Sequence, residues 1–305
     1  MLEKIVQDTR PMESKRLRQI VIAGRPNVGK STLANALVGA KVAIVSDKPQ
    51  TTRRAIRGVA TGSDWQLILI DLPGVQRPRD ALTSRMQRRV EQELAEADGC
   101  LLVVSAEQGI GPGDRFIARL LQSAPIWTAI AVNKVDTASR MQTVSTLSEA
   151  ADLGISDHVF PVSARTGHGV HELLQTLSGL LPPGPFYFEP RQRTDQAQPI
   201  LIAELVREQV LRRTREEVPH AVEVEVTEIE RQDSRVRITA VILTETESQR
   251  GILIGAGGRM VKAIGTAARR AIERELGTRV HLELSVKTRR HWRADERLLD
   301  RLGIE

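Results

Sequence analysis

Cysteine is almost missing from this chain of 305 residues, which contains only Cys100. A single cysteine cannot form an internal disulfide, so a small secreted domain held together by disulfides is excluded. Cys100 lies in the apolar run GCLLVV, where a buried strand position is favoured over a reactive thiol. We therefore expect a reducing, cytoplasmic location.

Long apolar runs and aromatic residues are also scarce. The first 24 residues carry charges throughout and include no apolar run long enough for a signal peptide or a membrane span. The six histidines lack the spacing of metal ligands, and no Ser, His and Asp arrangement suggests a hydrolase triad. Aromatic residues form 3% of the chain, so stacking of nucleic-acid bases on Phe or Tyr is not expected.

Positive charge, in contrast, is plentiful near the carboxyl end. The chain has a formal net charge of +6 and a pI of about 9.9. From Arg250 to Arg293 there are eleven Lys or Arg and three Glu, a net charge of +8, so the remainder carries −2. A polyanionic partner is therefore expected to bind this segment.

Apolar strands alternate with helical patterns over the first 180 residues. The runs QIVIAG, WQLILID, CLLVVS, TAIAVNK and HVFPVSA predict buried strands, separated by helical stretches such as TSRMQRRVEQELAEA. This alternation predicts an α/β domain with a mainly parallel sheet and helices on both faces.

The alternation stops at LPPGPFYFEP, residues 181–190, whose prolines cannot continue a helix. Beyond it the pattern predicts a small α+β domain with a helix, two strands, a helix entering a glycine loop, a second helix and a strand. We place an amino-terminal tail at residues 1–18, the first domain at 19–183, a linker at 184–197 and the second domain, with its basic tail, at 198–305.

The stretch GRPNVGKS, Gly24 to Ser31, matches the GxxxxGK[ST] phosphate loop and lies between a predicted strand and a predicted helix. Its backbone N–H groups would surround a β-phosphate, Lys30 would reach the β and γ oxygens, and the Ser31 hydroxyl would ligate Mg²⁺. The predicted nucleotide-binding residues here are Gly24, Asn27, Val28, Gly29, Lys30, Ser31 and Thr32.

Three further loops follow predicted strands in the order that a nucleotide-binding crevice needs. Asp71 and Gly74 belong to DLPG, where the carboxylate would hold Mg²⁺ through a water and the Gly74 N–H would meet the γ-phosphate. The motif NKVD covers residues 133–136, and SA covers residues 163 and 164. Ligands in open α/β sheets bind beside the carboxyl ends of strands, so the four loops predict one shared site.

The NKVD motif favours guanine over adenine. Asp136 offers two acceptor oxygens, which suit the ring imino hydrogen and the exocyclic amine of guanine, whereas adenine would leave the carboxylate unpaired. Asn133 would bridge base and phosphate loop, and the Lys134 stem would lie over the ring. Ser163 and Ala164 complete the predicted base site, with the Ala164 N–H meeting the guanine carbonyl.

Between the phosphate loop and DLPG lies the polar stretch SDKPQTTRR, residues 46–54, which suits a loop that orders around a γ-phosphate. Thr51 or Thr52 would bring a hydroxyl to Mg²⁺, and the sequence does not decide between them. Both enter the predicted nucleotide site, and Thr52 also enters the metal set with Ser31 and Asp71. The predicted catalytic set is Asn27, Lys30, Thr52, Asp71 and Gly74.

Val75 follows Gly74, where many GTPases have a glutamine that orients the attacking water. Valine cannot orient a water, so intrinsic GTP hydrolysis should be slow. Two sources of transition-state charge stay open. Asn27 could ligate K⁺ with its amide oxygen, as in related GTPases, or Arg53 and Arg54 could supply the charge directly.

A second glycine loop lies in ILIGAGGRMVKAIG, residues 252–265, within the basic segment. The order GRPNVGKS, QTTR, DLPG, NKVD and SA, followed by a small domain with IGAGG, resembles the Era family of bacterial GTPases. The resemblance extends from about Gln19 to the tail HWRADERLLDRLGIE. It implies a P-loop GTPase domain followed by a type II KH domain, with GTP, GDP and Mg²⁺ as ligands.

The resemblance also implies that the second loop binds RNA rather than nucleotide. It indicates single-stranded RNA near the 3′ end of small-subunit ribosomal RNA, a role in assembly of the small ribosomal subunit, and loose contact with the inner face of the cell membrane. No obligate protein partner is indicated. The implied RNA-binding residues are Gly255, Ala256, Gly257, Gly258, Arg259 and Lys262.

The sequence departs from the family at two positions. Leu72 replaces the usual threonine of DLPG, and Gly257 stands where many relatives have lysine, so some phosphate charge is missing and Arg259 and Lys262 would compensate. Aliphatic contacts to bases from Ile252, Ile254 or Val261 are an alternative to plain core packing of these residues.

Three alternatives remain at this stage. The chain could be an RNA-binding adaptor whose nucleotide is structural and hardly hydrolysed. It could also be a related tRNA-modifying GTPase, but those use a carboxyl-terminal catalytic cysteine. The tail HWRADE would form either a solvated terminal helix or one that contacts RNA.

Overall fold

The predicted strands of the first half form a six-stranded sheet in the computed structural model, which describes residues 16–75, 78–124, 126–181, 186–232 and 235–304. The strand order is β2-β3-β1-β4-β5-β6, and only the edge strand β2 runs antiparallel to its neighbour. The bounds are β1 Arg16–Ala23, β2 Ile56–Thr61, β3 Trp65–Asp71, β4 Gly99–Ser105, β5 Trp127–Asn133 and β6 Val159–Pro161.

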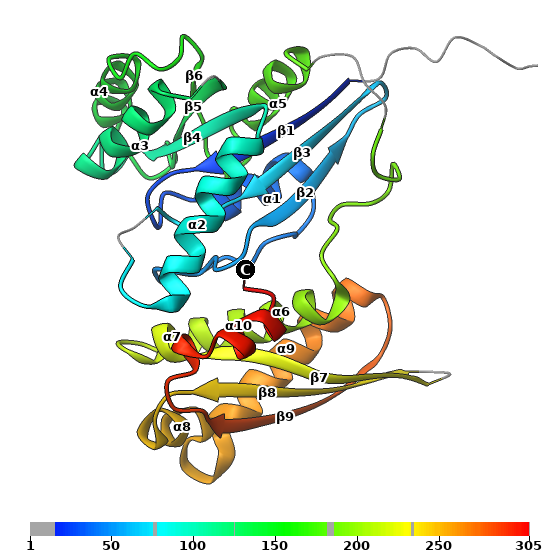
Figure 1. Ribbon diagram of the computed structural model, residues 1–305. Coiled ribbons are helices and arrows are strands. Elements are labelled where there is room, and N and C mark those ends of the chain that lie inside the picture. Colours follow the sequence, from blue (N-terminus) through cyan, green and yellow to red (C-terminus); the bar gives the residue numbers. More distant parts are fainter. Residues whose placement is uncertain (1–15, 76–77, 125, 182–185, 233–234, 305) are drawn as a thin grey trace, which may run out of the picture.

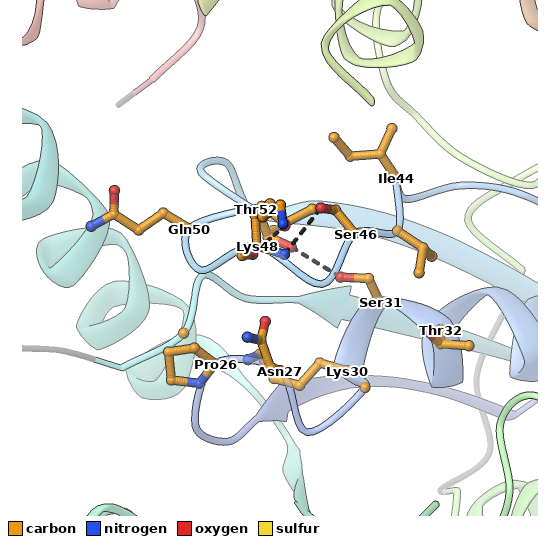
Figure 2. Close-up of a pocket in the computed structure, with 14 residues that line it drawn as sticks. Pro26, Asn27, Lys30, Ser31, Thr32, Ile44, Ser46, Lys48, Gln50 and Thr52 are labelled. Carbon is orange, nitrogen blue, oxygen red and sulfur yellow. Dashed lines mark hydrogen bonds between the residues drawn. The ribbon is translucent and has the colours of Figure 1, made fainter. Parts of the chain in front are cut away.

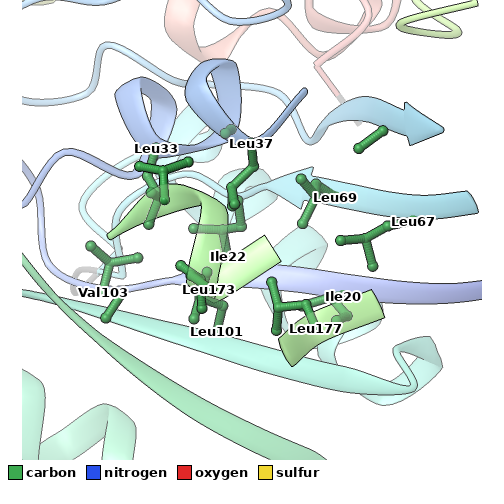
Figure 3. Close-up of a cluster of buried hydrophobic side chains, with 14 of the residues drawn as sticks. Ile20, Ile22, Leu33, Leu37, Leu67, Leu69, Leu101, Val103, Leu173 and Leu177 are labelled. Atoms are coloured by element: carbon green, nitrogen blue, oxygen red, sulfur yellow. The ribbon is translucent and has the colours of Figure 1, made fainter. Parts of the chain in front are cut away.

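Helices cover both faces of this sheet, because successive strand residues point to opposite sides (Figure 1). Ile20 and Ile22 pack with helices α1 and α5 in one apolar cluster (Figure 3), whereas Val21 and Ala23 pack with α2, α3 and α4 in a second. The bounds are α1 Lys30–Val38, α2 Ala81–Glu96, α3 Pro112–Gln122, α4 Arg140–Ala151 and α5 Val170–Gly179. The predicted α/β domain is confirmed.

The second half forms a three-stranded sheet in the order β7-β8-β9, with β7 antiparallel and β9 parallel to β8. Helices α6 and α9 pack on this sheet through a third apolar cluster that includes Val206, Ile238 and Ile264. The bounds are α6 Gln198–Arg213, α7 Val218–Ala221, β7 Glu223–Gln232, β8 Arg235–Thr244, α8 Glu247–Ile254, α9 Arg259–Leu276, β9 Val280–Thr288 and α10 Glu296–Arg301. The predicted small α+β domain is confirmed.

The carboxyl-terminal tail lies between the two domains. Trp292 is fully buried, and with α10 it packs against Leu82 and Met86 of α2 and against Val241 of β8. The Trp292 indole N–H also donates to the Ala221 carbonyl at 2.9 Å. Of the two alternatives for this segment, the solvated terminal helix is wrong, because its apolar face is buried between the domains, and contact with RNA stays a prediction.

The connection between the domains follows the edge of the first sheet. The Gln66 side chain accepts from the backbone N–H groups of Tyr187 and Phe188 at 3.0 Å, and Thr194 forms an isolated bridge with Gly58 of β2. Most of the expected amino-terminal tail and the boundary expected at residues 183 and 184 lie outside the described residues. Within the described part of the chain, no helix combines the length and apolar character needed to cross a membrane.

Candidate nucleotide and RNA sites

The phosphate loop connects the carboxyl end of β1 to the first turn of α1, and its glycines are required by packing. A Cβ on Gly24, whose φ is +151°, would lie 2.4 Å from the Val103 carbonyl oxygen. A Cβ on Gly29 would lie 2.4 Å from Nδ2 of Asn133. Only glycine therefore allows this loop to lie so close to the neighbouring strands.

Lys30 begins α1 and is buried beneath the loop. Its ammonium group donates to the carbonyls of Gly24 at 3.1 Å and Arg25 at 3.0 Å. Burial lowers the pKa of Lys30 to about 8, although the negative charge of Asp71 opposes this shift. The protonated lysine thus places a positive charge at the start of a helix, where backbone N–H groups also favour anions.

Three oxygen-bearing side chains meet beside the loop. The Ser31 hydroxyl donates to Asp71 Oδ2 at 2.6 Å, and Thr52 Oγ1 lies 3.0 Å from Ser31 Oγ and 3.3 Å from Asp71 Oδ2. The Thr51 hydroxyl instead donates to the Lys48 carbonyl at 2.6 Å. The geometry therefore places Thr52, not Thr51, with the other two predicted metal ligands.

Asp71 is fully buried, and its Oδ1 atom is without a hydrogen-bond partner in the described structure. Burial raises the pKa of Asp71 to about 6, while the charge of Lys30 and the Ser31 hydrogen bond oppose the rise. A buried carboxylate with one orphaned oxygen, whose other oxygen contacts two hydroxyls, fits a hard divalent cation, for which oxygen ligands are preferred.

The pocket drawn in Figure 2 is formed by the phosphate loop, residues 44–52 and Gly74. Asn27 donates from its amide nitrogen to the Asp47 carbonyl at 3.0 Å, which connects the phosphate loop to residues 46–54, which we call the switch loop. A Cβ on Gly74 would lie 2.9 Å from Cγ of Pro26, so DLPG directly contacts the phosphate loop. Val75 is part-buried against the apolar cluster on the α2 side of the sheet.

The base end of the crevice is built on Asn133. Its Nδ2 donates to the Val28 carbonyl at 2.9 Å, and its Oδ1 accepts from the Ala164 N–H at 3.0 Å. This one side chain therefore joins the phosphate loop to the SA loop; its contact with the phosphate loop is as predicted, and its contact with a base stays a prediction. The surrounding pocket is lined by Gly29, Thr32, Val45, Glu107, Asn133, Lys134, Asp136, Thr137, Ala164 and Arg165.

Asp136 is held by two neighbours at the rim of that pocket. Its Oδ1 accepts from the Ser163 hydroxyl at 2.7 Å, and its Oδ2 pairs with Arg165 at 2.5 Å. The Ser163 hydrogen bond and the Arg165 charge lower the pKa of Asp136. Sequence reasoning missed Arg165, although its position directly after the SA motif was a usable signal.

Arg53 and Arg54 do not face the phosphate loop. Both are buried against the second domain, where Arg53 pairs with Glu223 at 2.9 Å and Arg54 pairs with Glu204. The hypothesis that these two arginines supply charge to the transition state is therefore wrong for this arrangement. Together with Arg207, these residues form what we call the interdomain ion cluster: Arg53, Arg54, Glu204, Arg207 and Glu223.

The second glycine loop connects α8 to α9 at an exposed end of the small domain. Gly255, Gly257 and Gly258 have φ values of +70°, +60° and +76°, and no atom of the described residues lies within 4 Å of a Cβ built on Gly257 or Gly258. Arg259 donates from Nε to the Ala256 carbonyl at 3.2 Å, and this bond orients it beside the loop. The loop thus combines an open backbone with adjacent positive charge.

A shallow hollow of about 290 Å³ lies between α9 and β9. It is lined by Val261, Lys262, Gly265, Thr266, Arg269, Leu282 and Leu284. Ile252 is half exposed, whereas Ile254 and Val261 pack against the apolar cluster of the small domain. Ile254 therefore packs against the core, Val261 both packs against the core and lines the hollow, and Ile252 is open to a ligand.

Comparisons with known proteins match both domains. Residues 19–134 match a family model described as a 50S ribosome-binding GTPase, and residues 217–293 match a KH domain model. GTPase Era of Mycobacterium avium (strain 104) is 43% identical over 291 residues, which cover 93% of this chain and 97% of that protein. GTPase Era of Mycobacterium tuberculosis (strain ATCC 25618 / H37Rv) is 43% identical over 292 residues, with the same coverage.

Two solved structures are similar over almost the whole length. One is Era in complex with MgGDPNP and nucleotides 1506–1542 of 16S ribosomal RNA, with a TM-score of 0.91 at 33% identity, covering 95% of this chain and 99% of that one. The other is a variant of Aquifex aeolicus Era bound to GDP·AlF₄⁻, with a TM-score of 0.89, 33% identity and the same coverage. The chain therefore belongs to the Era family and is a GTPase with a carboxyl-terminal KH domain.

Proposed function

We propose that this GTPase is a slow switch that binds single-stranded RNA near the 3′ end of 16S ribosomal RNA and acts in assembly of the small ribosomal subunit. The observation that carries this proposal is the presence of two separate anion sites, a buried nucleotide crevice and an exposed basic glycine loop. The structural relative bound to MgGDPNP and nucleotides 1506–1542 of 16S ribosomal RNA supports the pairing of these two ligands.

At the phosphate end, the chain's own residues would neutralise and orient the triphosphate of GTP. Lys30 would bind the β and γ oxygens, and the Gly74 N–H would donate to the γ-phosphate. Ser31, Thr52 and Asp71 would hold Mg²⁺, which neutralises phosphate charge during transfer of the γ-phosphoryl group to water. Binding of this cation would satisfy the orphaned Oδ1 atom of Asp71, directly or through a water.

At the base end, Asp136 would accept both guanine donors, the imino hydrogen and the exocyclic amine. Arg165 must then release the Asp136 carboxylate, and its side chain is 71% exposed, so it can turn into solvent at low cost. The Ala164 N–H now donates to Asn133, and guanine would compete for this donor. Lys134, whose stem borders the pocket, would cover the ring.

Hydrolysis is expected to be slow because the side chain at the water-orienting position is apolar and packed away. Val75 contributes no hydrogen-bond partner, and Arg53 and Arg54 are held by the KH domain. We expect an intrinsic rate on the order of 10⁻⁴ to 10⁻² per second, as in unassisted small GTPases.

The RNA contacts would come from the open glycine loop. The backbone of Gly255, Ala256, Gly257 and Gly258 would lie against nucleotide phosphates, and Arg259 and Lys262 would add charge that Gly257 lacks. Bases would enter the hollow between α9 and β9, where the lining side chains are aliphatic and basic rather than aromatic.

A single-turnover assay of GTP hydrolysis tests this proposal against the adaptor alternative. The chain is loaded with GTP and Mg²⁺ with or without an RNA of the sequence 1506–1542, and a scrambled RNA of equal length is the control. A switch releases phosphate at a measurable rate that the matching RNA changes. Hydrolysis that stays at the rate of free GTP in all three samples would instead favour a structural nucleotide.

The tRNA-modifying alternative loses its chemical basis. Cys100 lies in β4 with no exposed surface, and burial raises the pKa of its thiol to about 12. A thiol in this state is not a nucleophile near neutral pH.

We also propose a cytoplasmic protein that contacts the inner face of the membrane loosely through charge. The net charge of +8 between residues 250 and 293 supports attraction to anionic headgroups. Co-sedimentation with vesicles that contain anionic lipid tests this, and binding should disappear in neutral vesicles.

A further inference from the structure

The residues next to Thr52 in the switch loop contact the second domain. Its neighbours on both sides make contacts there: the Thr51 carbonyl accepts from Arg207, and the Arg53 guanidinium donates to the carbonyls of Val222 at 2.6 Å and His220 at 3.0 Å. The Nε of Arg54 donates to the Leu302 carbonyl at 2.8 Å. The backbone that carries Thr52 therefore follows the position of the KH domain.

Arg207 makes the contact that is closest in sequence to Thr52. It lies on α6, is fully buried, and donates to Glu204 at 2.6 Å while its Nη2 also reaches the Thr51 carbonyl. That carbonyl belongs to the peptide bond that joins Thr51 to Thr52. The guanidinium thus fixes the peptide plane that precedes Thr52, whose hydroxyl lies 3.0 Å from Ser31 Oγ.

The Arg207 side chain can be replaced without leaving an unpaired carboxylate, because the interdomain ion cluster has more guanidinium groups than carboxylates. Three guanidinium groups share two carboxylates: Arg53 pairs with Glu223 at 2.9 Å, and Arg54 pairs with Glu204 and lies 3.5 Å from Glu223. If Arg207 becomes uncharged, two cations still face two anions. Loss of Glu204 or Glu223 would instead leave three buried cations facing one anion, which is strongly unfavourable.

We propose that Arg207 of the KH domain is a positioning residue for GTP hydrolysis, which holds the Thr51 carbonyl so that Thr52 can ligate Mg²⁺ in the triphosphate state. This inference rests on the proposed role of Thr52 as a metal ligand. It assigns the hydrolytic site a contribution from a helix residue that is separated from Thr51 by 156 positions along the chain.

The test replaces Arg207 in the full chain and follows Mg²⁺ dependence. In Arg207→Met, the Mg²⁺ concentration for half-maximal GTP hydrolysis should rise about tenfold, the size expected for one charge-assisted hydrogen bond. Affinity for GDP should stay within about twofold of the parent, because a switch loop is ordered by the γ-phosphate that GDP lacks. This GDP measurement also shows that the first domain remains folded.

The matched control is Arg212→Met on the same helix. Arg212 is half exposed and pairs only with Glu208 among the contacts described for it, at 3.0 Å, and it does not touch residues 51–54. Its Mg²⁺ requirement should equal that of the parent. A second variant, Arg207→Lys, keeps one charged donor and should recover at least half of the lost Mg²⁺ response.

A double-mutant cycle with Thr52→Ala decides whether Arg207 acts through Thr52. If it does, adding Arg207→Met to Thr52→Ala causes little further change in the Mg²⁺ requirement. Equal Mg²⁺ requirements for Arg207→Met and the parent, or fully additive effects in the cycle, would overturn the positioning role. Failure of the parent itself to hydrolyse GTP with Mg²⁺ would instead overturn the proposed function.

Discussion

The two glycine loops of this protein use the same residue for different physical reasons. In the phosphate loop, a Cβ on Gly24 or Gly29 would meet a neighbouring atom at 2.4 Å, so glycine is required by the surrounding core. In the loop after α8, a Cβ on Gly255 would also lie 2.8 Å from Cβ of Met260, but no described atom lies within 4 Å of a Cβ on Gly257 or Gly258, which are favoured only by their positive φ. The first loop is therefore fixed by packing against the core, whereas the centre of the second loop is exposed and accessible to a ligand.

The charges beside the two loops differ in the same way. Lys30 and Asp71 are buried. Burial lowers the pKa of Lys30 and raises the pKa of Asp71, so it favours the neutral form of each side chain. Lys262 is exposed, and Arg259 lies at the surface of α9. Buried charges select one ligand with fixed geometry, whereas exposed charges attract any polyanion and are screened by salt.

The largest effect is expected from Gly24→Ala, which tests whether the first loop depends on packing. Strain at φ +151° and the contact with the Val103 carbonyl should lower GTP affinity about hundredfold or more, since each such strain costs about 1–3 kcal/mol. Titration with a fluorescent GTP analogue measures this. Gly109→Ala is the control, because its φ is +63° but no atom of the described part of the chain lies within 4 Å of a Cβ built there. Unchanged affinity in Gly24→Ala would contradict a packing requirement.

A smaller but more selective effect is expected from Asp136→Asn. The amide can donate to the carbonyl that xanthine has in place of the guanine amine, so preference should move from GTP to xanthosine triphosphate. GTP affinity should fall by about one to two orders of magnitude. Competition between the two nucleotides in one binding assay measures the exchange, and GTP affinity equal to the parent's would mean that Asp136 does not read the base.

Gly257→Asp tests whether the second loop binds RNA. A carboxylate placed where the nucleotide backbone should pass is expected to lower RNA affinity about tenfold or more, while GTP affinity stays the same. The control is Gly277→Asp at the other end of α9, where φ is +64° and the surrounding space is also open. RNA titrations at one salt concentration measure both variants. Equal affinities of all three proteins would remove the KH loop from the RNA site.

The smallest expected effect concerns K⁺ at Asn27. If its amide oxygen ligates K⁺ beside the phosphates, hydrolysis should be a few-fold faster in K⁺ than in Na⁺ at equal ionic strength. Asn27→Ala should abolish that difference but retain GTP binding. Because Arg53 and Arg54 are engaged with the KH domain, equal rates in both salts would point to a partner protein as the source of charge.

Local patterns were sufficient to predict the strands, the two glycine loops and the loops that contain Asp71, Asn133 and Asp136. Each of these features depends on residues close together in sequence and on the carboxyl ends of parallel strands. The contact of Asn133 with Val28 was also predictable, because the motif pair implies it.

The interface between the domains was not predictable in this way. Arg53 meets Glu223 across 170 positions, and Trp292 packs against α2 across more than 200. A basic residue in a polar loop has the same local pattern whether it faces a ligand, solvent or another domain. This explains why Arg53 and Arg54 were an alternative source of charge at the nucleotide, and why a solvated tail was one of two alternatives.

Trp292 gives the domain junction an optical signal. Its indole is fully buried, lies 5.5 Å from the Arg53 guanidinium and contacts both the tail and α2, whereas Trp65 and Trp127 pack against the first sheet. Indole emission moves to longer wavelength when water reaches the ring. Any rearrangement that separates the switch loop from the KH domain would therefore change the protein's intrinsic fluorescence, so nucleotide exchange and RNA binding can be followed at this junction without an added label.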